Sequence, residues 1–272
     1  MPVLNLPDLS LYYETHGSPA APALLLLHGL GSSADDWQLQ APVFSRRYDV
    51  ITVDLRGHGR SVGAGATAGS SRPFTIEQMA DDAAALLDHL QVAAAYVVGL
   101  SLGGCVAQAL AVRYPARVRA LVLVNTFARL RPAGWRGAGR LLKRAWLFAF
   151  APMPALAAFI ARGLFPKPEQ RPYYEAAVAR LSQNTKGPYL AAMRAVARFD
   201  LRRQLAAVRC PALVVAGDRD QTVPLAAAQA LHRAIPGARF ALLADSGHAS
   251  PYDQTENFNE VVLAFLAEQA PQ

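Results

Sequence analysis

The stretch Ala95-Tyr-Val-Val-Gly99-Leu-Ser101-Leu-Gly103-Gly104-Cys-Val-Ala-Gln-Ala-Leu-Ala-Val-Arg113 decides the fold. A short apolar run typical of a strand ends in Gly-x-Ser-x-Gly, and a run with small residues, typical of a helix, follows at once. The glycines leave room on a tight turn where a Cβ would clash. This turn is expected to hold the Ser101 hydroxyl at the carboxyl edge of a sheet, facing the free N–H groups of the helix.

Two later residues complete an arrangement of nucleophile, base and acid. Asp220 follows the apolar run 211–217, and His248 follows the run 239–244 in a Ser-Gly-His sequence. The order serine, acid, histidine differs from that of the chymotrypsin and subtilisin types. We therefore predict that Ser101 is a nucleophile, that His248 is its general base and that Asp220 orients the histidine. Asp218 is the alternative acid, because it lies only two residues earlier.

An oxyanion formed at this serine needs backbone N–H donors. The sequence His28-Gly29-Leu30-Gly31 follows the apolar run 23–27, where the second donor is expected. We predict that the N–H groups of Leu30 and Leu102 form the oxyanion hole. His28 is expected to brace the loop rather than to transfer protons.

Length and composition restrict the class of protein. The chain has 272 residues, of which 53% are hydrophobic and 17% charged, which suits one α/β domain with an insertion. The first residues lack the features of a signal peptide. The longest charge-free stretch, 145–161, contains two prolines and is shorter than the about 20 apolar residues of a membrane span. Two cysteines without metal-ligand spacing predict no disulfide framework and no metal site, so we expect a cytoplasmic protein without metal or cofactor.

Strand and helix patterns alternate along most of the chain. This rhythm predicts a parallel sheet covered by helices on both faces. The expected strands are 11–14, 23–27, 49–54, 95–99 and 119–125, with further strands near 212–217 and 239–244. The expected helices are 34–46, 75–90, 102–113, 225–235 and 255–268, the second with a capping box at Thr75 and Gln78.

The alternation of strand and helix patterns stops at residues 127–203, which contain prolines, arginines and aromatic residues but no β-branched run. We interpret them as a helical cap inserted into a core domain formed by residues 1–126 and 204–272. The apolar residues of the cap are expected to line a substrate pocket or simply to pack the cap itself. The candidate substrate-binding residues are Trp135, Trp146, Phe148, Phe150, Phe159 and Met193.

Positive charge is concentrated in the cap. The chain has a net charge of +7, and residues 127–203 hold 15 Lys and Arg against three Asp and Glu. A solvated basic surface is the default interpretation. The alternative is a surface that attracts an anionic substrate or an acidic carrier protein. Nucleic-acid binding is not expected, because no motif for it is present.

The motifs together resemble the α/β-hydrolase fold enzymes. They are His28-Gly-Leu-Gly31, Asp54-Leu-Arg-Gly-His-Gly-Arg-Ser61, Gly99-Leu-Ser-Leu-Gly-Gly104, Gly217-Asp-Arg-Asp-Gln-Thr-Val-Pro224 and Ser246-Gly-His248. The resemblance implies a mostly parallel sheet with an inserted helical cap. It also implies that the acid lies four residues before Pro224, which selects Asp220. Within this superfamily, the chain is most similar to carboxylesterases and 3-oxoadipate enol-lactonases. It also resembles carrier-protein methyl ester esterases and cofactor-free haloperoxidases.

We therefore expect a serine hydrolase that cleaves a carboxylic ester through an acyl-enzyme. An enol-lactonase is the alternative, because it performs the same chemistry on a cyclic ester. Some proteins of this fold have lost catalysis and act as binding modules. The presence of a residue at every triad position argues against that reading here.

Overall fold

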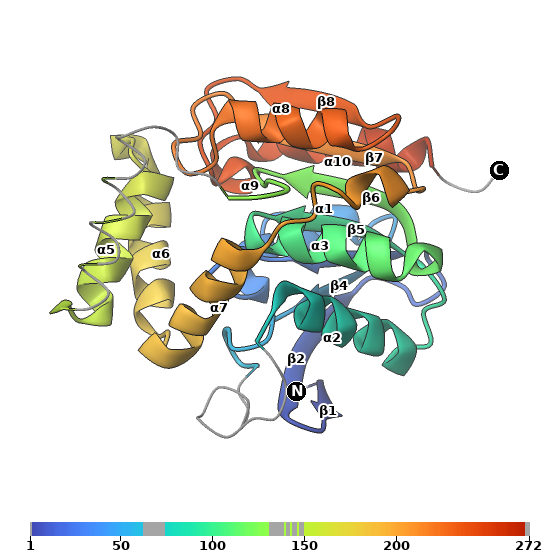
Figure 1. The fold of residues 1–272 in the computed structure, drawn as a ribbon, viewed down its shortest axis with the longest axis horizontal. Helices are drawn as coiled ribbons and strands as arrows, with labels where there is room; N and C mark the ends of the chain where they lie inside the picture. Colours follow the sequence, from blue (N-terminus) through green and yellow to red (C-terminus); the bar gives the residue numbers. More distant parts are fainter. Residues whose placement is uncertain are drawn as a thin grey trace.

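An eight-stranded sheet forms the centre of the molecule (Figure 1). The computed structural model describes residues 2–61, 74–130 and 151–269, together with Gly139, Leu142, Trp146 and Phe150. The strand order is β1-β2-β4-β3-β5-β6-β7-β8. The strands are β1 (Val3–Leu6), β2 (Leu9–His16), β3 (Ala23–Leu27), β4 (Asp49–Val53), β5 (Ala95–Leu100), β6 (Val118–Val124), β7 (Ala212–Gly217) and β8 (Arg239–Leu243).

The sheet is antiparallel at one edge and parallel elsewhere. β1 pairs with β2 and β2 with β4 in antiparallel register, whereas every pairing from β4 to β8 is parallel. The central strands are buried on both faces, which explains why their sequences are continuous apolar runs. The carboxyl ends of β3, β5, β6, β7 and β8 therefore share one edge, where ligands bind in open sheets of this kind.

Helices cover both faces of the sheet. One face packs against α2 (Ile76–His89), α3 (Leu102–Arg113) and α8 (Leu225–Ala234). The other face packs against the 3-10 helix η1 (Ala34–Trp37), α1 (Ala41–Phe44) and α10 (Thr255–Ala267). A short helix α9 (Ser250–Asp253) precedes α10. The predicted fold class is therefore confirmed.

Two expected elements differ from those observed. The helix expected over 34–46 is divided into η1 and α1, because Pro42 has no N–H for an interior helical bond and lies in the first turn of α1. The first strand, β1, was not predicted from sequence. The expected cap at Thr75 is present, since its hydroxyl accepts a hydrogen bond of 3.1 Å from the Gln78 N–H. The Gln78 side chain donates instead to Asp82, so the capping box is not reciprocal.

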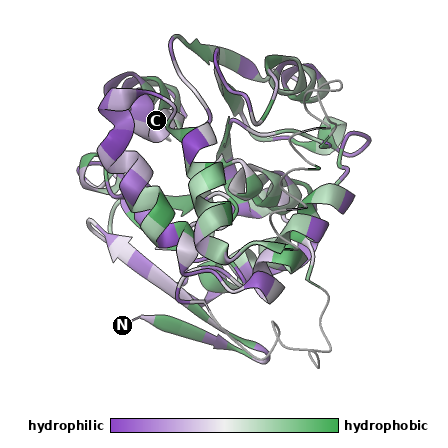
Figure 2. Cartoon of the chain, turned by 90° about the vertical axis from the view of Figure 1, so that its left-hand side faces the viewer, coloured by the Kyte–Doolittle hydropathy of each residue, from purple (hydrophilic) through white to green (hydrophobic). Residues whose placement is uncertain are grey.

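Among the described residues between β6 and β7, the helices α5 (Met153–Leu164), α6 (Arg171–Ser182) and α7 (Lys186–Arg198) stand towards the left of Figure 1. Both ends of this insertion meet at an isolated bridge between Arg129 and Asp200. Figure 2 views the chain from this side and shows both hydrophilic and hydrophobic residues along these helices. The boundaries of the cap at 127 and 203 remain a prediction. No helix among the described residues is long and apolar enough to cross a membrane.

Buried charges hold the loop after β4. The Asp54 carboxylate accepts hydrogen bonds from the Ala34 and Arg60 N–H groups at 2.6 and 2.7 Å. Arg56 forms ion pairs of 2.6 and 2.7 Å with Asp8 and Asp82. These contacts fix the loop beside the His28 segment, and they indicate a structural role for the motif at 54–61.

The same loop gives a pH-dependent contribution to stability. Burial lowers the pKa of His58 from its ordinary value of 6.5 to about 3. Between these values the unfolded chain binds a proton that the native state excludes, so stability falls as the pH decreases. The expected loss from His58 is about 2 kcal/mol between pH 7 and pH 5.

We expect His58→Asn to reduce this pH dependence, because asparagine has no ring that titrates. Its amide can still donate to the Arg56 carbonyl that the His58 Nδ1 contacts at 3.0 Å, so the loop should keep this hydrogen bond. Urea unfolding at pH 5 and pH 7 measures the effect. The fall in unfolding free energy should shrink by about 2 kcal/mol in the variant. The same fall in both proteins would contradict the assignment.

Candidate active site

Ser101 occupies a strained turn between β5 and α3. Its backbone has φ 53° and ψ −110°, in the region that L residues rarely adopt. Glycines make the turn possible: a Cβ at Gly99 would collide with the backbone of Gly103, and a Cβ at Gly103 would collide with the carbonyl oxygen of Leu27. The Gly-x-Ser-x-Gly spacing is thus required by the close approach of three backbone segments.

The neighbouring strand β6 supports this turn. The Ser101 N–H donates to the Val124 carbonyl at 2.9 Å, and the Thr126 hydroxyl donates to the Ser101 carbonyl at 2.7 Å. A Cβ at Gly104 would lie 2.6 Å from the Thr126 side chain, so the second glycine of the pair lets the helix approach β6. These contacts hold the backbone of Ser101 in its strained conformation.

His248 and Asp220 form a buried pair. The His248 Nδ1 lies 2.7 Å from the Asp220 Oδ2, and the two side chains are 8% and 2% exposed. The other oxygen, Oδ1, accepts the N–H groups of Thr222 and Val223 at 2.7 and 2.9 Å. A proton on Nδ1 directed at the carboxylate leaves Nε2 as the basic nitrogen of the ring.

Asp218 has a different partner. Its carboxylate accepts the Ser246 N–H at 3.0 Å, and thus ties the β7 loop to the loop that carries His248. Asp245 forms ion pairs with Lys167 and Arg219 at 2.6 and 2.8 Å, at the surface. Of the three acids, Asp220 alone contacts the His248 ring within the described residues.

Asn125 was missed by the sequence reasoning. It directly follows β6, has a φ of 44° and is buried. Its Nδ2 donates to the His248 carbonyl and the Ser250 hydroxyl at 2.9 and 2.7 Å, while its Oδ1 accepts the Gly217 N–H at 2.9 Å. Asn125 therefore connects the acid loop with the base loop. Its position after a strand was visible in the sequence, but its partners lie about a hundred residues away.

Leu30 and Leu102 are the two residues whose N–H groups the sequence predicts as oxyanion donors. Both residues line the same cavity as Ser101, and Leu102 begins α3, where backbone N–H groups have no helical acceptor. His28 braces the Leu30 loop: its ring nitrogens lie 2.7 Å from the Gly29 carbonyl oxygen and 2.9 Å from the Leu55 N–H nitrogen. This use of both ring nitrogens fits the structural role that the sequence suggested.

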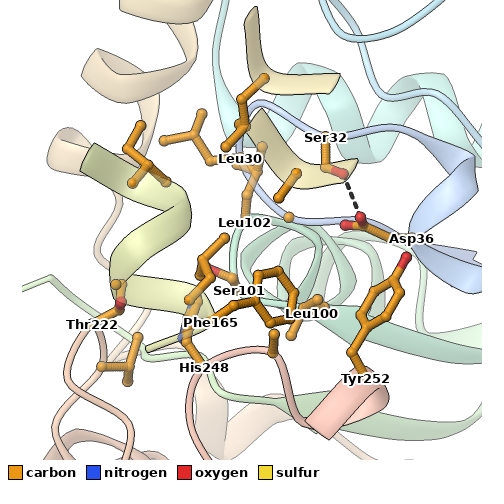
Figure 3. Close-up of a pocket in the computed structure, with 18 of the residues that line it drawn as sticks. Leu30, Ser32, Asp36, Leu100, Ser101, Leu102, Phe165, Thr222, His248 and Tyr252 are labelled. Carbon is orange, nitrogen blue, oxygen red and sulfur yellow. Dashed lines mark hydrogen bonds between the residues drawn. The ribbon is translucent and has the colours of Figure 1, made fainter. Parts of the chain in front are cut away.

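A cavity of about 460 Å³ contains Ser101 and His248. Figure 3 shows these two residues between Thr222 on one side and Ser32, Asp36 and Tyr252 on the other. The apolar residues of the wall include Phe127, Leu130, Phe159, Val196 and Val223. Its polar residues include Ser32, Asp36, Gln38, Arg180 and Tyr252.

The candidate substrate-binding residues are distributed unevenly. Phe159 lines the cavity. Met193 packs instead against the cap cluster around Leu156, outside the residues that line the cavity. Trp146 and Phe150 are 60% and 76% exposed and contact each other rather than the cavity, because they lie on an outward face of the chain. Trp135 and Phe148 lie outside the described residues.

The sequence reasoning missed much of the cavity wall, such as Phe127, Tyr173 and Tyr252. These residues come from loops and helices that only the tertiary structure brings together. The described residues contain no group of three or more His, Cys, Asp or Glu that could hold a metal ion.

Residues 22–255 match the alpha/beta hydrolase fold family. This chain is a member of that family. The hydrolase is 32% identical to 3-oxoadipate enol-lactonase 2 of Acinetobacter baylyi, over 97% of this chain and 95% of that protein. It is 33% identical to a Caulobacter protein provisionally named a carbamate hydrolase, over 96% of this chain and 97% of the relative. The enol-lactonase from Burkholderia xenovorans has a similar structure, with a TM-score of 0.87, 30% identity, and 98% and 100% of the two chains covered.

Family membership and these relatives agree with the expected fold and with hydrolysis as the class of reaction. The α/β-hydrolase described here also resembles the enol-lactonases over nearly its full length, as the sequence motifs suggested.

Proposed function

We propose that this hydrolase cleaves carboxylic esters through an acyl-enzyme on Ser101. One observation carries the proposal: a serine in a strained strand-to-helix turn shares a cavity with a histidine whose Nδ1 is paired to a buried carboxylate at 2.7 Å. A serine hydroxyl is a weak nucleophile until a base removes its proton. The orientation of His248 leaves Nε2 for that purpose.

The proposed reaction has two steps. His248 Nε2 takes the hydroxyl proton as Ser101 Oγ attacks the ester carbonyl, and the N–H groups of Leu30 and Leu102 stabilise the oxyanion. Collapse of this intermediate breaks the bond to the alcohol, which leaves with the proton from His248. Water then attacks the acyl-enzyme by the same route, and it releases the acid and restores the serine. Asp220 stabilises the charged imidazole throughout.

A cyclic ester is the second candidate substrate. The enol-lactonase names of the Acinetobacter and Burkholderia relatives favour it. A lactone undergoes the same two steps, except that its alcohol group stays attached to the acyl chain. Carbamates are a third class to test, because their carbonyl group can be attacked in the same way and a Caulobacter relative carries that provisional name.

A substrate panel separates these possibilities. We would measure kcat/KM for p-nitrophenyl esters of graded chain length, an enol-lactone and a p-nitrophenyl carbamate. The proposal expects ester or lactone turnover that is lost in Ser101→Ala. Turnover of the carbamate alone would contradict the proposed substrate class, and equal turnover by Ser101→Ala would contradict the mechanism.

Phe159 provides a test of the acyl pocket. Phe159→Ala should move the optimum towards longer acyl chains, because each further buried methylene contributes up to about 0.8 kcal/mol, or about fourfold in kcat/KM. The chain-length profile of p-nitrophenyl esters measures this shift. Phe150→Ala is the matched control, since Phe150 is 76% exposed and should leave the profile unchanged. An identical profile in all three proteins would remove Phe159 from the proposed pocket.

The interaction of the basic cap with an anionic substrate or an acidic carrier remains a proposal. Arg162 supports it, because this exposed arginine lines the cavity. If the cap attracts anions, kcat/KM for an ester with a carboxylate at the cavity rim should fall as ionic strength rises, since salt screens charges within about 10 Å at 0.1 M. A neutral ester of equal length should show a flat response. Equal salt dependence for both esters would leave the arginines as a solvated surface.

A further inference from the structure

The polar end of the cavity has no role in the proposed acyl transfer. Ser32 and Asp36 come from the η1 region, Arg180 from the cap helix α6, and Tyr252 from α9. Figure 3 shows the hydroxyl groups of Ser32 and Tyr252 directed towards the Asp36 carboxylate. Three separate parts of the chain therefore place hydrogen-bonding groups at one end of an otherwise largely apolar cavity.

Charge is balanced at this end. The Asp36 Oδ1 accepts hydrogen bonds from the Ser32 hydroxyl and from Arg180 Nη1, the latter at 2.7 Å. The Asp36 and Arg180 side chains are 13% and 21% exposed. Burial raises the pKa of Asp36, although Arg180 and the hydrogen bonds oppose that shift. The Asp35 carboxylate lies 4.0 Å from Arg180 Nε, so the arginine has two acidic neighbours.

Because the charges of Asp36 and Arg180 already balance, the polar end disfavours binding of an anionic substrate group. A substrate carboxylate at this end would meet Asp36 beside a guanidinium that Asp36 and Asp35 already neutralise. A neutral polar group has no such penalty. Hydrogen-bonding capacity remains, because a guanidinium has more N–H groups than these contacts use and a carboxylate can accept several hydrogen bonds.

Donor and acceptor stand next to each other in the pair of Arg180 and Asp36. A ketone carbonyl could use only the donor. A hydroxyl group can donate to the carboxylate and accept from the guanidinium, whereas the Tyr252 hydroxyl already donates to the Asp35 backbone carbonyl at 3.1 Å. An alkyl group would cover these polar atoms, which would then lose their hydrogen bonds to water without gaining new ones.

We infer that the polar end formed by Ser32, Asp36, Arg180 and Tyr252 binds a hydroxyl substituent of the substrate, away from the bond that is cleaved. This inference rests on the proposed function and narrows its substrate class to hydroxylated esters or lactones. Arg180 and Asp36 are the specificity-determining residues, and they contact the substituent rather than the reacting carbonyl.

Two series of esters test the inference. In the first, acyl chains of equal length end in methyl, hydroxyl or carboxylate, and the alcohol is constant. In the second, the same substituents end the alcohol part, and the acyl group is constant. In at least one series, kcat/KM for the hydroxyl ester should exceed that of the methyl ester by about tenfold or more, because a site built for a hydroxyl rejects the analogue that lacks it. The carboxylate ester should be the poorest of the three.

Asp36→Asn and Ser32→Ala should both lower the ratio of hydroxyl to methyl activity. Asp36→Asn should also improve the carboxylate ester relative to the methyl ester, since it removes the opposing charge. Arg171→Ala is the matched control on α6, because its pair with Glu175 is exposed and lies outside the cavity. Its ratios should equal those of the unmodified protein.

Equal kcat/KM for methyl and hydroxyl esters in both series would overturn the inference. Unchanged ratios in both Asp36→Asn and Ser32→Ala would also overturn it. The proposed function fails in a different way: no ester in either series would then be cleaved with dependence on Ser101.

Discussion

Replacing Asp220 with asparagine should lower kcat by about 10⁴-fold while the fold is retained, because a comparable triad loses about that much when its histidine is held in the wrong tautomer. The Asp220 carboxylate accepts a proton-bearing Nδ1 at 2.7 Å and two backbone N–H groups. An asparagine can preserve the backbone contacts, but its NH₂ group can face the ring and place the proton on Nε2. Steady-state kinetics with the best p-nitrophenyl ester, beside a circular dichroism spectrum, measures the effect.

Asp218→Asn is the matched control. Asp218 lies two residues away and accepts the Ser246 N–H at 3.0 Å, a bond that an asparagine oxygen can still accept. Its loss of activity should stay below about tenfold, since a weakened hydrogen bond costs about 1 kcal/mol. A large loss in Asp218→Asn together with a small one in Asp220→Asn would reverse the assignment of the acid.

Gly103→Ala should destabilise the protein by about 3 kcal/mol or more, because an added Cβ would collide with the Leu27 carbonyl oxygen and come 2.8 Å from that of His28. Backbone atoms at the centre of the sheet cannot move aside as a flexible side chain can. The midpoint of thermal unfolding should fall by at least about 6 °C. Activity should fall as well, since the collision also displaces the loop that carries Leu30.

Gly163→Ala provides the contrast. Gly163 lies in α5, and a Cβ there would meet no atom within 4 Å among the described residues. Alanine should stabilise this helical position by up to about 1 kcal/mol. If Gly103→Ala unfolds at the same temperature as the unmodified protein, the close approach of α3 to β3 is not as described.

Local sequence information was sufficient for the elements that fix the site. The spacing of Gly99 and Gly103 predicted a tight turn, because a side chain at either position would collide with backbone atoms. The apolar runs before Ser101, Asp220 and His248 predicted that all three residues lie at one edge of a parallel sheet. Buried strands have continuous apolar runs, and a helix such as α2 has a capping residue, Thr75, at its start. These local patterns predicted the positions of the elements that the structure contains.

The cavity wall could not be predicted in this way. Its apolar residues belong to loops and cap helices whose positions depend on tertiary packing. The sequence did not indicate which aromatic side chains of the cap point into the cavity. Phe159 faces the cavity, whereas Phe150 is 76% exposed. Asp36 and Arg180 lie 144 positions apart along the chain, so their ion pair has no local signature.

The most direct test of the account is labelling with a fluorophosphonate, followed by intact-mass and peptide mass spectrometry. A nucleophilic serine that is activated by a histidine forms a stable phosphonyl adduct. We expect one adduct per chain, located on Ser101, with loss of ester hydrolysis in proportion to labelling and no adduct in Ser101→Ala. An adduct on another residue, or full hydrolytic activity in a chain labelled at Ser101, would contradict the proposed mechanism.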